Sequence, residues 1–104
     1  MLVACGGPKL ASLQSSCEQR YADFPNQTRC LKREALAADP QLSRPGGDLV
    51  RLYLAYGDAA AARVEDGTMR EVDARLAMAE LYSRIKAQAD ARQADQQARY
   101  SQFL

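Results

Sequence analysis

A helix stop and a helix start stand side by side in this 104-residue chain. Gly67 suits the left-handed position just past the end of a helix. Thr68 with Glu71 three residues later has the form of a capping box, in which the two side chains satisfy free backbone N–H groups. Apolar residues recur at helical spacing on both sides of this point. The sequence therefore predicts a tight helical hairpin over 49–104.

The helix before the turn is predicted over 49–66, with Asp48 as its N-cap. The apolar residues that share one face of it, and that we expect in the core, are Leu49, Leu52, Tyr53, Tyr56, Ala60 and Val64. The helix after the turn begins near Thr68 and carries apolar residues on two nearly opposite sides. One side holds Met69, Val72, Leu76 and Ala79, and the other holds Ala74, Met78, Leu81 and Ile85. We expect this helix to lie between the preceding helix and the disulfide-linked pair of helices, with Tyr82 in the core.

Beyond Ile85 the last helix loses its large apolar residues. Ala, Gln and Arg dominate 86–99 and favour helix, but nothing there anchors the segment to a core. We therefore expect a polar helical extension. Apolar residues return at the end of the chain as Tyr100, Phe103 and Leu104. These three residues are either an incidental apolar end of a solvated tail or an anchor that binds another protein.

The first part of the chain shows a second pair of helical segments. One helix face is formed by residues spaced by three and four, namely Leu10, Leu13, Cys17, Tyr21 and Phe24. A turn signal with Pro25 follows. A second short helix is predicted to start near Asn26 or Thr28 and to fade before Pro40.

Cys17 and Cys30 lie almost symmetrically about this turn. Two antiparallel helices would bring them together, and a disulfide closing that loop would stabilise the fold by about 3 kcal/mol. Two reduced, buried thiols are the alternative. Zinc is disfavoured, because three cysteines at this spacing with no histidine match no standard zinc site.

The whole chain is predicted to be all-α, a small antiparallel bundle of about four helices in two hairpins with a long polar C-terminal helix. Residues 1–8 are expected to form a tether, and 9–104 a single helical domain. Within that domain, 9–39 is the disulfide-linked hairpin, 49–104 is the long hairpin, and 40–48 is a linker rich in Pro and Gly.

The N-terminal residues Leu2-Val3-Ala4-Cys5 are followed by Gly6-Gly7-Pro8-Lys9. This stretch resembles the lipobox and tether of small uncharacterised Gram-negative lipoproteins. The resemblance implies that Cys5 becomes the first mature residue and carries lipid on its sulfur and its amine. A basic start and an apolar stretch precede the lipobox in that family, whereas four residues precede Cys5 here, so we expect the natural start to lie upstream, within a signal peptide.

The same resemblance implies a location in the cell envelope. In the enterobacterial sorting pattern an Asp after the lipidated Cys retains a lipoprotein in the inner membrane. Gly6 therefore favours the outer membrane, with the protein facing the periplasm. An exported location agrees with a Cys17–Cys30 disulfide, since disulfides persist in oxidising compartments.

Composition removes several function classes from consideration. The chain has no histidine, so it lacks the usual general base at neutral pH and the commonest metal ligand. Its formal net charge is +1, so no strong positive electrostatic field attracts it to nucleic acid. No stretch is apolar for long enough to span a membrane. We therefore expect no enzyme, no cofactor, no metal and no nucleic-acid partner.

The function that fits best is an accessory or structural interaction protein held at the membrane by lipid on Cys5, with an envelope protein as its partner. Two alternatives come from other classes. One is a soluble helical module without lipid that self-associates through its last helix. The other is a thiol redox protein that uses Cys17 and Cys30.

Overall fold

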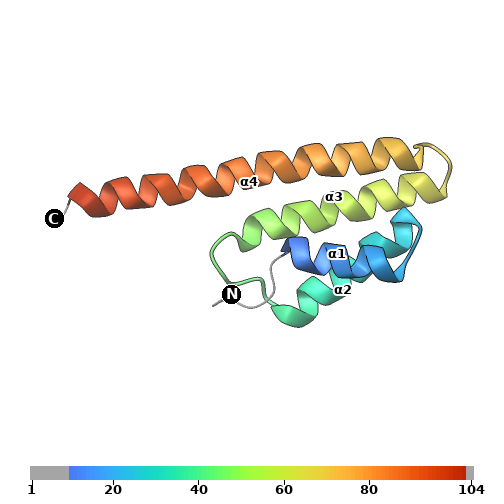
Figure 1. Ribbon diagram of the computed structural model, residues 1–104, viewed down its shortest axis with the longest axis horizontal. Helices are drawn as coiled ribbons and strands as arrows, with labels where there is room; N and C mark the ends of the chain where they lie inside the picture. The colour runs from blue at the N-terminus through green and yellow to red at the C-terminus, as the bar shows by residue number, and fades with distance from the viewer. Residues whose placement is uncertain (1–9, 103–104) are drawn as a thin grey trace.

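The computed structural model describes residues 10–102, and in that part of the chain every regular element is a helix (Figure 1). Their order is α1 (Leu10–Arg20), α2 (Phe24–Ala38), α3 (Gly47–Glu65) and α4 (Glu71–Gln102). α1 pairs with α2, and α3 with α4, and α3 lies between α2 and α4. The prediction of an all-α bundle built from two helical hairpins is confirmed.

The close packing of three helices centres on Gly57 of α3. A Cβ atom added there would lie 3.0 Å from Cγ2 of Thr28 in α2 and 3.2 Å from Cε of Met78 in α4. The absent side chain thus allows α2 and α4 to approach α3 at the same level. Tyr53, one turn before Gly57, and Ala74 of α4 are almost fully buried beside this point.

A disulfide holds α1 against α2. Cys17 and Cys30 are bonded, with their Cα atoms 5.7 Å apart, and both residues have no exposed surface. The predicted pairing is therefore present in the structure. Cys17 is the single buried residue of α1, so the attachment of this helix depends heavily on the bond.

The boundary between the first two helices differs from the prediction. α1 ends at Arg20, so Tyr21 and Phe24 do not continue it, and α2 begins at Phe24 rather than at Asn26 or beyond. Asp23 causes the early start, because its side chain accepts a hydrogen bond from the N–H of Asn26 at 3.0 Å and so caps α2. The predicted end of this helix before Pro40 is confirmed.

The start of α3 also differs from the prediction. Its N-cap is Gly46 in the left-handed conformation, with φ of 88°, so Asp48 lies in the first turn and is not the cap. The linker folds back tightly here: a Cβ atom on Gly47 would lie 1.8 Å from the carbonyl oxygen of Leu42, which is itself buried. The Gly46-Gly47 pair is therefore what lets the linker turn into α3.

The turn between α3 and α4 uses Gly67 as predicted, with φ of 84°. The N–H groups of Gly67 and Thr68 donate to the carbonyls of Val64 and Arg63, which is the Schellman pattern that closes a helix end. The capping-box prediction is wrong. The Thr68 hydroxyl bonds the carbonyl of Arg63 and the carboxylate of Asp66, so α4 begins three residues after Thr68.

Part of the predicted core is at the surface. Leu52 and Tyr56 of α3 are 50% and 44% exposed, and Val72 and Leu76 of α4 are 63% and 59% exposed. The prediction that α4 is sandwiched is therefore wrong. The disulfide-linked hairpin packs against α3 through α2, which leaves the outer side of α4 without a neighbouring helix in the part that the structure describes.

Candidate functional site

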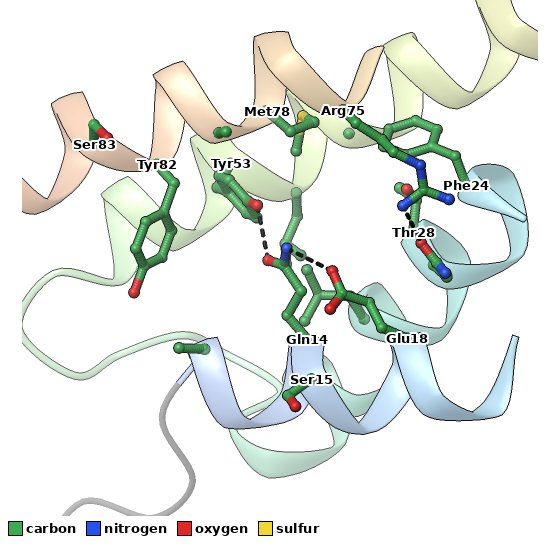
Figure 2. A pocket seen from close by; sticks show the side chains of 16 residues that line it. Gln14, Ser15, Glu18, Phe24, Thr28, Tyr53, Arg75, Met78, Tyr82 and Ser83 are labelled. Atoms are coloured by element: carbon green, nitrogen blue, oxygen red, sulfur yellow. Dashed lines mark hydrogen bonds between the residues drawn. The ribbon is translucent and has the colours of Figure 1, made fainter. Parts of the chain in front are cut away.

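A groove of about 550 Å³ lies between α1 and α4 (Figure 2). α1 packs on α2, and α4 packs on α3, but α1 and α4 do not pack closely on each other. They form the two walls of the groove, and α2 and α3 form its floor. The groove thus results from placing two helical hairpins side by side.

The floor of the groove is mostly apolar. It is formed by the side chains of Phe24, Leu31, Tyr53 and Leu54, with Met78 reaching in from α4. The Tyr53 ring also meets the ring of Tyr82 edge to face, with centroids 5.9 Å apart. An apolar floor between helical walls suits an apolar side chain or an amphipathic helix better than a small charged substrate.

A short chain of hydrogen bonds orders the α1 wall. The Tyr53 hydroxyl donates to Oε1 of Gln14 at 2.8 Å, and Nε2 of Gln14 donates to a carboxylate oxygen of Glu18 at 3.3 Å (Figure 2). Burial raises the pKa of the Tyr53 hydroxyl above its usual value, so this group stays a neutral donor at physiological pH. The chain fixes the orientation of Gln14 along the groove.

Arg75 closes the other end of the groove. Its guanidinium lies 5.8 Å from the centre of the Phe24 ring and donates to Oε1 of Gln27 at 2.8 Å and to the carbonyl of Ala22. It also donates to the carboxylate of Glu71 at 2.7 Å, and this hydrogen bond lowers the pKa of Glu71. These bonds tie the start of α4 to the connection between α1 and α2.

The groove shows no arrangement for catalysis. Its one carboxylate, Glu18, is exposed and bonded to Gln14, and no nucleophile with an adjacent base lines it. Among residues 10–102 no three His, Cys, Asp or Glu side chains gather as a metal site. Within the same range no helix is long and apolar enough to cross a bilayer.

The sequence-predicted site residues that the structure describes lie in two different places. Cys17 and Cys30 come together in the core, where the guanidinium of Arg20 donates to the Cys30 sulfur at 3.0 Å. Tyr100 is 65% exposed on the far end of α4 and does not line the groove. Cys5, predicted to carry lipid, and the apolar pair Phe103 and Leu104 lie outside the described residues.

Sequence reasoning did not find the groove itself. It correctly predicted that Tyr53 and Met78 are buried, but their shared role in a groove floor follows only from the separation of α1 and α4. No local signal reports that separation. The comparisons give no further guide, because no family model, no curated protein and no solved structure matches this chain.

A bidentate ion pair marks the point where α4 leaves the body of the protein. Arg92 donates to both carboxylate oxygens of Asp48 at 3.0 and 2.9 Å and so joins α4 to the first turn of α3. Beyond it α4 continues past the start of α3 (Figure 1), and every residue from 93 to 102 is exposed. We call residues 93–102 the overhang.

The Asp48–Arg92 pair makes a prediction about pH. The hydrogen bonds from Arg92 lower the pKa of Asp48 below its ordinary value of 3.8. The pair therefore stabilises the folded state above that ordinary value, and the stabilisation is lost as the pH falls through the lowered pKa. In an NMR titration of the Asp48 carboxyl, we expect Arg92→Gln to raise the pKa toward 3.8.

The matched control is Arg99→Gln, which removes a similar guanidinium that bonds Asp95 within the overhang. This substitution should leave the pKa of Asp48 unchanged. An Asp48 carboxyl that titrates alike in the wild type and in Arg92→Gln would show that the pair does not form.

Proposed function

We propose that this protein is a lipid-anchored interaction protein of a bacterial cell envelope, which binds a helical segment of a protein partner in the groove between α1 and α4. The groove is the observation that carries the binding role. It offers an apolar floor and two helical walls, which is the usual surroundings of a bound amphipathic helix. The anchor rests on the lipobox-like residues around Cys5.

The chain between the proposed anchor at Cys5 and the groove is short. Four residues lie between Cys5 and the start of α1 at Leu10, so the two are at most about 17–18 Å apart when this stretch is extended. α1 is also one wall of the groove. Lipid on Cys5 would therefore hold the groove close to the membrane surface. In the outer membrane, the groove would face the periplasm.

A thiol redox function has less support. A reactive cysteine needs exposure and a lowered pKa, whereas Cys17 and Cys30 have no exposed surface and bond to each other. Their position between α1 and α2 fits a structural disulfide, and such a disulfide suits an oxidising compartment.

The anchor is tested by expressing the natural precursor gene in a Gram-negative host. The mature chain is expected to begin at Cys5 and to be heavier than its sequence by a diacylglycerol and an acyl chain, as read from its intact mass. Cys5→Ser should abolish this added mass and release the protein from the membrane fraction. Retention of Cys5→Ser in the membrane would contradict the anchor.

The groove is tested by photo-crosslinking in the same cells. A photoreactive amino acid at Ser83, on the α4 wall, is expected to give a covalent adduct with an envelope protein. The same probe at Ala37, an exposed position of α2 outside the groove, is the control and should give none. Ala79→Arg should place a bulky charge on the groove wall and remove the Ser83 adduct. Equal adducts from both positions would refute binding in the groove.

A further inference from the structure

We propose that the helical segment bound in the groove is the C-terminal end of α4 from a second copy of this chain. Two copies would exchange these ends reciprocally, so that each overhang lies between α1 and α4 of the other copy. The inference rests on the proposed role of the groove as a helix-binding site and names its occupant. It does not depend on the lipid anchor.

The overhang presents the same face as the part of α4 that packs in the body. Tyr100 follows Tyr82 by 18 residues, which is five full turns of an α-helix, so both side chains point the same way from the helix axis. Tyr82 contacts Tyr53 in the body, whereas Tyr100 is 65% exposed. In the sequence Phe103 follows Ile85 by the same interval. Tyr100 thus places one large apolar side chain beyond the start of α3, on the face of α4 that packs in the body.

The length of the overhang matches the groove. Its ten residues span about 15 Å at 1.5 Å per residue. The α4 wall from Arg75 to Ser83 spans about 12 Å, and the α1 wall from Ala11 to Glu18 about 10 Å. Three turns of helix therefore occupy the groove from end to end.

The charges of α4 are self-complementary about Gln88. Lys86 and Asp90 are both exposed and already pair with each other at 3.5 Å within one chain, on the side of α4 that continues from the groove residues Ala79 and Ser83. They are equally distant from Gln88. If two α4 helices run antiparallel with a two-fold axis at Gln88, Lys86 of each copy lies opposite Asp90 of the other.

The same register places Tyr100 at the end of the groove that Arg75 closes. With the axis at Gln88, Tyr100 of one copy lies level with Leu76 of the other, which is 59% exposed in the single chain. Small side chains at Ser83 and Ala87 lie where the two α4 helices pass each other, and they allow the helices to approach closely. The length of the overhang, the position of Tyr100 and the charges of Lys86 and Asp90 thus all fit one antiparallel arrangement of two α4 helices.

Sedimentation equilibrium of the full chain tests this proposal. The wild type is expected to be a dimer that dissociates on dilution. Lys86→Asp should raise the dissociation constant at least about tenfold, because two like-charge contacts replace two attractive ones. The double variant Lys86→Asp, Asp90→Lys exchanges the charges and should return to within about threefold of the wild type, since the symmetric pairing is restored.

Tyr100→Asp tests the apolar contact without endangering the fold, because Tyr100 is 65% exposed and does not belong to the core of the body. It should weaken the dimer by about tenfold or more. Arg70→Asp is the matched control: Arg70 is also exposed and paired with an acidic residue on α4, but it lies outside the paired stretch. It should leave the dissociation constant unchanged.

The methyl signal of Met78 in the groove floor reports where the overhang binds. In wild-type NMR spectra it should shift with protein concentration, and in Tyr100→Asp it should stay constant. A wild type that is monomeric at about 1 mM, where even a weak complex forms, overturns the inference. A dimer that is insensitive to both Tyr100→Asp and Lys86→Asp overturns it as well. With either result, a Ser83 crosslink to a different envelope protein would still support the groove as a binding site, so the two proposals fail separately.

Discussion

The disulfide between Cys17 and Cys30 is the constraint on which the groove depends. α1 has 11 residues and buries only Cys17, and a helix of that length is marginal in water by itself. The bond fixes it on α2, and the hydrogen bond from Tyr53 to Gln14 adds one contact with α3. Leu10 and Leu13 are only partly buried against the core, so the covalent link is the strongest hold on this wall of the groove.

The other wall depends on α3. Gly57 lets α2 and α4 approach α3 at one level, and the Schellman turn at Gly67 returns the chain so that α4 runs antiparallel to α3. α4 is much longer than α3, so it extends beyond the Asp48–Arg92 pair. The same helix thus supplies a wall of the groove at one end and an exposed overhang at the other. That combination is what gives the chain both a binding surface and a segment suited to it.

Local signals in the sequence predicted most of the fold. Gly67 acts within one turn of chain, and Cys17 and Cys30 are only 13 residues apart, so their consequences were visible without a structure. The cap at Asp23 was equally local, since an Asp with Pro two residues later is a helix-start signal, and it was missed. The exposure of Val72 and Leu76 could not be predicted, because periodicity identifies an apolar face of a helix but does not say whether another helix covers it. The groove depends on how two hairpins sit together, which no short stretch of sequence specifies.

Amide hydrogen exchange with and without the disulfide tests the central claim most directly. The comparison is between the oxidised protein and the double variant Cys17→Ala, Cys30→Ala. We expect the amides of α1 to lose their protection in the variant while those of α3 keep theirs, because α1 alone relies on the bond. Protection of α1 that survives in the variant would contradict this account. Equal loss from α1 and α3 would contradict it too, since the disulfide would then support the whole fold rather than one wall of the groove.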